Sequence, residues 1–149
     1  MTFLEPLLRD PQAAWMLTSS GGSVVAPQLE AALDSATRRR GLLGRDTWID
    51  AALVIAPCMA VHTFFMRFAI DVLFVNHSGT IVGISHALGP WRIACSWRAF
   101  ATIELPAGTV ERVGLREGYR LTIRPAAPQS AAPRPSRPPE SVSTGRGAR

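Results

Sequence analysis

The chain has 149 residues, of which 47% are hydrophobic, and a formal net charge of +5. This length predicts one domain with a real hydrophobic core. The charge is uneven, because the segment after Pro125 carries four arginines against one glutamate and so supplies +3 of the total. The remaining body is nearly balanced, which argues against the clustered basic face that specific nucleic-acid binding requires.

The start of the chain and its cysteines indicate a soluble, cytoplasmic protein. Residues 1–12 lack the apolar core of a signal peptide, and we expect a loose leader there. The longest apolar run, residues 51–61, is broken by Pro57 and is too short to span a bilayer. Cys58 and Cys95 form no CxxC motif. Reduced thiols are expected in the cytosol, although one bridge could form in an oxidising compartment.

The first predicted elements are a hairpin and a helix. Two short apolar runs flank a Ser/Gly turn within residues 15–26, which predicts a β-hairpin. Residues 29–40 place apolar side chains at helical spacing and end in three arginines, and Gly41 is a typical stop signal. We therefore expect a helix over residues 29–40, followed by a tight turn at residues 42–45.

The rest of the chain predicts short strands separated by turns. Residues 76–79 have turn chemistry and join two strands into a second hairpin over residues 71–86. Residues 99–105 alternate between apolar and polar side chains, as in a half-buried strand. A short helix is predicted over residues 106–115, with a proline in its first turn. The strands predicted in this part cover residues 51–56, 61–66, 71–75, 80–84, 99–105 and 119–123.

Short strands with few helices do not fit a doubly wound parallel sheet. They predict a mainly β (α+β) fold, a compact antiparallel small barrel or sandwich of about seven or eight short strands with two short helices. We assign this single β-rich domain to residues 13–124. Residues 125–149 are rich in Pro, Ala, Ser and Arg and contain few large apolar side chains, so we expect a disordered tail there.

Four polar residues interrupt the apolar run over residues 58–75, namely Cys58, His62, Arg67 and Asp71. A polar group buried in such a run loses free energy unless it finds a partner. The four residues are therefore either satisfied structural groups or parts of a site.

Three blocks of the chain resemble a known family. They are residues 40–45, residues 62–74 and the Glu-Leu-Pro-Ala-Gly block at residues 104–108. In order and spacing, the chain is similar to the bacterial and archaeal domain-of-unknown-function family 192, also called uncharacterised protein family 0127. Ala69 stands where the family usually has a proline, so the turn there is expected to be less rigid. The resemblance implies a compact β-rich fold and no established activity.

Asp71 and His62 each allow a structural and a functional interpretation. An acid at the start of an apolar strand commonly accepts backbone N–H bonds or pairs with a nearby cation, here Arg67. Asp71 could instead anchor a ligand pocket or act as a general base. His62 alternates with apolar residues on one strand face, where it is either hydrogen-bonded in the core or a group that titrates near neutral pH in a cleft.

Cys58 and His62 form a Cys-x3-His pair that supports two alternatives to simple binding. In a hydrolase-like enzyme, Cys58 would be the nucleophile, His62 its base and Asp71 the group that orients the imidazole. No Gly-rich oxyanion element lies beside Cys58, which weakens that alternative. The pair could also belong to a metal-binding domain, but the spacing does not supply the further ligands such a site needs. We therefore expect no metal and no cofactor.

Two further segments supply candidate binding side chains. Residues 40–45 could hold an anion, or they could form a helix cap with Arg45 bonded to an acid or to carbonyl groups. Glu104 is expected to form an ion pair, for example with Arg45 or Arg67. Aromatic and arginine side chains in the loop over residues 89–98 could stack on sugars or bases, or could cover a barrel end.

These observations favour a non-enzymatic binding or accessory module over an enzyme. Its ligand would be a small polar molecule or a partner segment laid along an exposed strand edge. The sequence predicts neither specific nucleic-acid binding nor a membrane span, and it leaves the oligomeric state open. The predicted ligand-binding residues are His62, Arg67, Asp71, Arg45, Trp91, Trp97 and Glu104.

Overall fold

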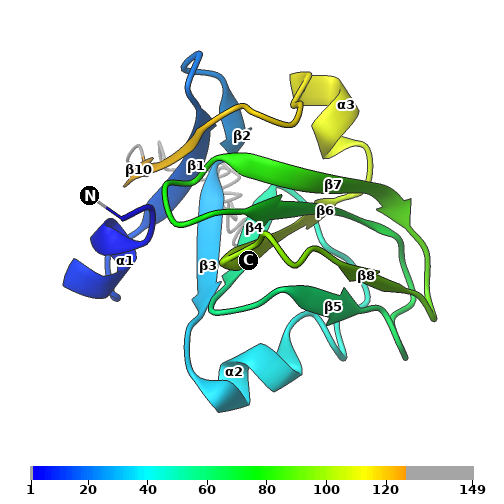
Figure 1. The fold of residues 1–149 in the computed structure, drawn as a ribbon. Helices are drawn as coiled ribbons and strands as arrows, with labels where there is room; N and C mark the ends of the chain where they lie inside the picture. Colours follow the sequence, from blue (N-terminus) through cyan, green and yellow to red (C-terminus); the bar gives the residue numbers. More distant parts are fainter. Residues whose placement is uncertain (1, 127–149) are drawn as a thin grey trace, which may run out of the picture.

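The computed structural model of the protein describes residues 2–126, which form three helices and ten strands (Figure 1). The mainly β prediction is confirmed, with two or three more strands and one more helix than the sequence predicts. Within this part of the chain, every helix is too short to cross a membrane. The helices are α1 (Glu5–Arg9), α2 (Ser35–Arg40) and α3 (Thr109–Val113).

A five-stranded sheet forms the centre of the fold. In sheet order its strands are β3 (Gln28–Ala32), β4 (Ala51–Ile55), β9 (Ala101–Pro106), β6 (Ile70–Val75) and β7 (Ile81–Leu88). β3 pairs with β4 in parallel, and the other neighbours are antiparallel. β4 and β6 are buried throughout, because their near-continuous apolar sequences are covered on both faces of the sheet.

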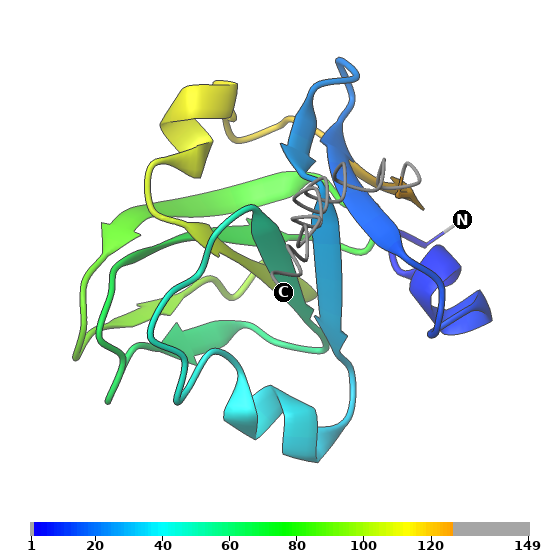
Figure 2. The same cartoon turned by 180° about the vertical axis from the view of Figure 1, so that it is seen from behind.

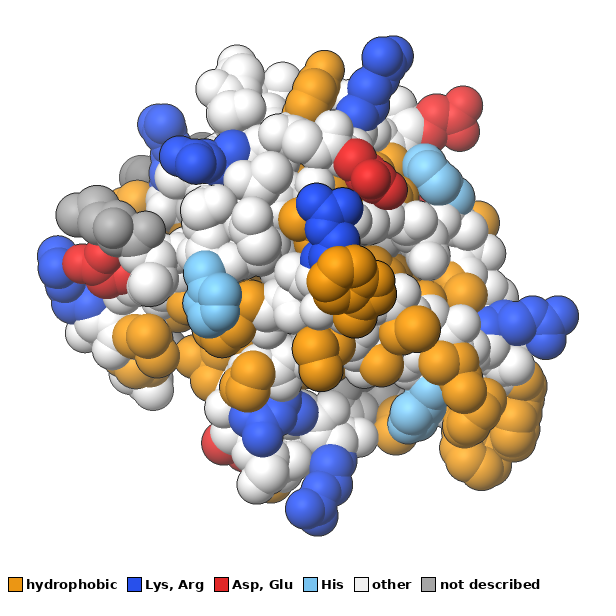
Figure 3. All heavy atoms as spheres, viewed as in Figure 1, with side chains coloured by type: hydrophobic (Ala, Val, Ile, Leu, Met, Phe, Trp, Pro, Cys, Tyr) orange, Lys and Arg blue, Asp and Glu red, His pale blue; other side chains and the backbone are white. Residues whose placement is uncertain are grey.

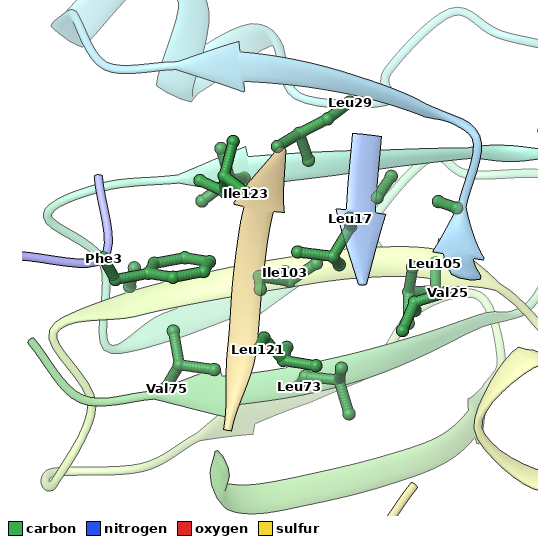
Figure 4. Close-up of a cluster of buried hydrophobic side chains, with 14 of the residues drawn as sticks. Phe3, Leu17, Val25, Leu29, Leu73, Val75, Ile103, Leu105, Leu121 and Ile123 are labelled. Carbon is green, nitrogen blue, oxygen red and sulfur yellow. The ribbon is translucent and has the colours of Figure 1, made fainter. Parts of the chain in front are cut away.

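The larger hydrophobic core lies on one face of this sheet. A three-stranded sheet of β10 (Leu121–Pro125), β1 (Trp15–Ser19) and β2 (Val24–Ala26) covers that face. Leu17 and Leu121 of this cover meet Leu73 and Ile103 of the central sheet (Figure 4). Two sheets packed face to face form a sandwich, and the described strands do not close into a barrel.

A smaller core lies on the opposite face. Its cover is the two-stranded sheet of β5 (Ala60–His62) and β8 (Ile93–Cys95), with α2 beside β5 in both views (Figures 1 and 2). Val61 and Ala94 of the cover pack in the same cluster as Leu53 and Val72 of the central sheet. These covering elements are short, so this face has the thinner layer.

The predicted helix over residues 29–40 is wrong in its first half. That half is β3, because it pairs along its whole length with β4. α2 begins only after Asp34, whose Oδ1 accepts hydrogen bonds from the backbone N–H groups of Ala36 and Thr37, both at 2.9 Å. Asp34 is therefore an N-cap residue, and hydrogen bonding from Thr37 lowers its pKa.

Residues 2–12, part of the segment where we expect a loose leader, pack against the larger core. This segment contains α1, and Phe3, Leu4 and Leu7 are buried in the larger cluster. Burial of these three apolar side chains is favourable, although the segment lacks the long apolar run of a signal peptide. At the other end, β10 continues to Pro125, and the expected disordered tail lies outside the described residues from 127 onward.

The strand predicted over residues 61–66 is also shorter than expected. β5 ends at His62, because the backbone N–H of Met66 donates to the carbonyl of Thr63 at 3.2 Å and the chain turns there. This turn brings the next residues to the outer side of the two-stranded sheet.

Candidate functional site

Glu104 is the buried acid around which the candidate site is built. It lies on the central strand β9, in register with Leu53 of β4 and Val72 of β6. Ile103 and Leu105 belong to the larger core, so strand alternation turns Glu104 toward the smaller one. Glu104 is only 4% exposed, and its Oε2 has no hydrogen-bond partner among the described residues. A buried polar atom in this state is costly and calls for an explanation.

Glu104 lines a hollow of about 380 Å³ that also involves α2, β4 and β5, and we call it the Glu104 hollow. Its volume is within the range of small-molecule sites. α2 contributes three consecutive arginines from its C-terminal turn, whereas β4 and β5 contribute mainly apolar groups. The hollow is lined by Ser35, Arg38, Arg39, Arg40, Gly41, Leu42, Leu43, Ile55, Pro57, Cys58, Ala60, Val61, His62, Met66 and Glu104.

Burial raises the pKa of Glu104 to about 7 from its ordinary 4.5, and the nearby cation of Arg45 opposes that rise. Contrary to the prediction from the sequence, Arg45 forms no ion pair with Glu104. Its two Nη atoms donate to the two carboxylate oxygens of Glu30 at 3.1 and 2.7 Å, and its guanidinium lies 4.5 Å from the ring centroid of Trp48. Glu104 is thus an acid that exchanges its proton near neutral pH.

Asp71 lies on the other face of the central sheet. It alternates with Leu73 and Val75, which belong to the larger core, and it is 1% exposed. Its Oδ1 accepts from the backbone N–H of Ala87 at 2.8 Å, and its Oδ2 accepts from the backbone N–H of Val110 at 2.9 Å. Asp71 therefore joins β7 and the start of α3 to β6, which is the structural interpretation of this residue.

Arg67 is also separate from the Glu104 hollow. Its Nη1 donates to Oδ1 of Asp46 at 2.6 Å, and both side chains are more than three-quarters exposed. Arg67 does not pair with Asp71, which was one of the alternatives from the sequence; the oxygens of Asp71 accept backbone hydrogen bonds instead. An ion pair this exposed adds little to stability.

Cys58 and His62 line the Glu104 hollow together. The Cys58 thiol donates to the carbonyl of Ala60 at 3.1 Å, and the His62 ring stacks on Phe64 with 4.9 Å between centroids. Asp71 does not orient the imidazole, since its bonds go to backbone groups. Across residues 2–126, no group of three or more His, Cys, Asp and Glu side chains is placed to hold a metal ion.

Trp91 and Trp97 lie outside the hollow, on the outer side of the β5–β8 sheet. Trp91 is 56% exposed and Trp97 is 86% exposed, so neither closes the site. Of the predicted ligand-binding residues, the structure brings only His62 and Glu104 to one hollow, and it adds Cys58 from the enzyme alternative.

Sequence reasoning missed Arg38 and Arg39 as site residues. The available signal was the run of three arginines before Gly41, but the sequence interpretation treated Arg38 and Arg39 only as a helix end and considered an anion site only from Arg40 onward. Arg38 also holds α2 in place, because its Nη1 donates to the carbonyl of Leu33 at 2.7 Å. Arg39 and Arg40 form no ion pair with any other described residue.

Known proteins with the same fold include two solved bacterial structures. One is a Sinorhizobium meliloti 1021 protein provisionally described as a transcription regulator, with a TM-score of 0.65 and 26% identity over 73% of this chain and 91% of that chain. The other is a protein of unknown function from Novosphingobium aromaticivorans, with a TM-score of 0.62 and 20% identity over 72% of this chain and 82% of that chain. The second likeness shows the fold alone.

Sequence comparison gives a consistent result. A UPF0127 protein of Pyrococcus furiosus is 40% identical over 63 residues, which is 42% of this chain. The aligned region spans only 53% of that relative's own length. The pattern of the family DUF192, described as an uncharacterized ACR, matches residues 16–123. The chain therefore belongs to the DUF192 family, the family whose motifs it resembles in sequence.

Proposed function

We propose that this protein is a non-enzymatic binding module that holds a small polar ligand in the Glu104 hollow. The observation that carries the proposal is the buried Oε2 of Glu104, which lacks a partner while lining a hollow of suitable size. A ligand that donates a hydrogen bond to this oxygen would remove the cost of leaving it unpaired.

The charges around the hollow suggest the chemistry of the ligand. Arg39 and Arg40 are exposed cations at the end of α2, free of ion pairs within residues 2–126, and they suit an anionic group such as a carboxylate. Glu104 suits a cationic or neutral N–H donor. A zwitterion of amino-acid size carries both groups, and we assign this class to the hollow.

The pKa of Glu104 gives this proposal a pH dependence. An ammonium group binds the ionised carboxylate best, and the pKa of Glu104 is about 7 without a ligand. Affinity should therefore fall by up to about tenfold for each pH unit below that value, because the ligand must first displace the proton. Above it, affinity should be nearly constant until the ammonium group itself titrates.

Thermal unfolding in the presence of the common α-amino acids tests the assignment. At a ligand concentration 100 times its dissociation constant, a bound zwitterion should stabilise the protein by about 2.7 kcal/mol. The α-hydroxy acids and simple amines are matched probes that each lack one of the two charges, and they should give much smaller shifts.

The protein variants for this test are Glu104→Gln and, as a matched control, Glu111→Gln on the exposed side of α3. The amino-acid shift should disappear in Glu104→Gln and persist in Glu111→Gln. If no zwitterion shifts the unfolding of the wild type, or if hydroxy acids shift it equally, the assigned ligand class is wrong.

A thiol enzyme is the second candidate, because Cys58 and His62 line the same hollow as Glu104. In that case Cys58 would be activated by His62, and iodoacetamide at neutral pH should modify Cys58 faster than the more exposed Cys95. Mass spectrometry of the two peptides measures both rates. Faster modification of Cys95, or an inert Cys58, would exclude this candidate.

A further inference from the structure

Large hydrophobic side chains gather on the outer side of the β5–β8 sheet. Figure 3 shows this surface as a group of hydrophobic side chains over β5 and β8. We call it the aromatic face. Exposed apolar groups this close together mark interaction sites more often than scattered ones do. The aromatic face consists of Met59 (56% exposed), Phe65 (72%), Trp91 (56%), Ile93 (64%) and Trp97 (86%).

Backbone and ring contacts bring these side chains together. Ile93 lies opposite His62 in the β5–β8 pairing, and the backbone N–H of Ser96 donates to the carbonyl of Met59 at 2.9 Å. The rings of Phe65 and Trp91 meet edge to face, with 4.6 Å between centroids. These contacts place the five residues on the β5–β8 sheet and the loops beside it.

Two of these residues hold a strained backbone. Phe65 has φ of 65° and Trp91 has φ of 61°, a region that bulky residues rarely adopt. Buried Thr63 fixes both turns, because its carbonyl accepts from the backbone N–H of Trp91 and its hydroxyl donates to the carbonyl of Gly89 at 2.6 Å. Strain held this firmly, while the rings stay in solvent, points to a role in recognition.

The charges of the same segments all have one sign. Residues 58–70 and 89–100 contain three arginines and one histidine, and they contain no aspartate or glutamate. Arg92 and Arg98 form no ion pair within residues 2–126, whereas Arg67 is paired with Asp46. An anionic partner is therefore favoured on grounds of charge.

We propose that the aromatic face docks on an anionic lipid surface. Trp97 and Phe65 are too exposed to line a groove for a peptide or a small molecule. Met59 and Ile93 have no ring to stack on nucleic-acid bases, but aliphatic and aromatic side chains beside arginine suit the boundary between acyl chains and anionic headgroups. The docking is peripheral and independent of the ligand proposed for the Glu104 hollow.

Cosedimentation with vesicles tests the proposal on the full chain. The probes are mixed vesicles of phosphatidylcholine and phosphatidylglycerol, and vesicles of phosphatidylcholine alone. The wild type should bind the anionic vesicles, and high salt should weaken that binding. The arginines beyond residue 126 are common to all variants, so differences between variants report the aromatic face.

Matched substitutions localise the binding. The double variant Ile93→Ser with Trp97→Ser should bind at least about tenfold more weakly, because it removes apolar groups from the lipid contact. Ile49→Ser, which alters an isoleucine that is 72% exposed outside the aromatic face, should bind as the wild type does. Arg98→Gln should weaken binding by about fivefold, and the exposed Arg116→Gln should not.

Three outcomes would overturn the proposal. The first is no binding to the anionic vesicles. The second is equal binding by the double variant and Ile49→Ser, which would place the contact elsewhere. The third is displacement of the vesicles by a short single-stranded oligonucleotide whose binding also depends on Trp97, which would identify nucleic acid as the partner.

Discussion

Replacing Glu104 by glutamine tests whether the central sheet imposes the pKa shift described above. The pKa of Glu104 is about 7 in the folded protein, against an ordinary value of 4.5. Between these values the folded state binds more protons than the unfolded state, so the contribution of Glu104 to stability falls as the pH rises. Above pH 7 the Glu104 carboxylate is ionised in both states, and burying this charge lowers the stability of the folded protein by about 3 kcal/mol.

Glutamine has the shape of the protonated acid and does not ionise. Below pH 4.5 the stability of Glu104→Gln should lie within about 1 kcal/mol of that of the wild type. Above pH 7 the variant should be the more stable protein by about 3 kcal/mol. For a domain of this size, that difference is roughly 10 °C in Tm.

Urea unfolding at a series of pH values, followed by tryptophan fluorescence on dialysed protein, gives the free energies. The decisive quantity is how the difference in stability between Glu104→Gln and the wild type changes with pH. Any effect of the amide group that does not depend on pH adds the same amount at every pH and so does not alter this change. Glu111→Gln controls for the loss of one carboxylate at an exposed position. A difference between the wild type and Glu104→Gln that stays constant from pH 4.5 to above pH 7 would show that the carboxyl is hydrated or paired in solution.

Three further substitutions test the structural assignments. Asp71→Asn should lower the free energy of unfolding in urea by about 2 kcal/mol, because the NH2 group of asparagine would then face one of the two backbone N–H groups that Asp71 accepts from. The control Asp46→Asn, at an exposed position, should change it by less than about 1 kcal/mol. Equal effects would contradict the role of Asp71. Thr63→Val should speed hydrogen exchange in the turns at residues 63–66 and 89–92, and unchanged exchange would contradict its joining role. Gly79→Ala should lower Tm much more than Gly22→Ala. Both glycines have positive φ, but only a Cβ at position 79 would lie 2.8 Å from a backbone carbonyl oxygen. Equal losses of Tm in the two variants would contradict this close packing.

Local sequence patterns predicted the elements that depend on local chemistry. The hairpin within residues 15–26 and the turn at residues 76–79 follow from Ser, Gly and Asn side chains that favour these conformations. The segment at residues 28–32 was misassigned because its apolar spacing also fits a helix. Its strand conformation depends on parallel pairing with β4, a partner about twenty residues away that no local pattern reveals.

The site was harder to predict because burial depends on distant cover. The sequence of β9 alternates like a strand with one solvent face, which would leave Glu104 in water and free to pair with Arg45. In the structure α2 and the β5–β8 sheet lie over that face, so Glu104 is enclosed. The uninterrupted apolar strand at residues 51–55 was an available sign that the central sheet is covered on both sides.

The two faces of the central sheet contribute differently to stability, and this difference explains how the domain can fold with the buried Glu104, which lowers its stability. On one face lies the larger core of the packed sandwich, where buried Asp71 joins β6 to β7 and to the start of α3, and this packing can supply most of the free energy of folding. A cost of about 3 kcal/mol is a large share of the 5–15 kcal/mol typical of a domain, so it is tolerable only where packing elsewhere compensates. The Glu104 side is covered by α2, β5 and β8, each six residues or fewer, and short covering elements open at lower free energy than a core does. If the hollow binds the ligand that we propose, that ligand can reach the carboxyl without unfolding the sandwich, and a variant that gains stability at Glu104 should lose binding there.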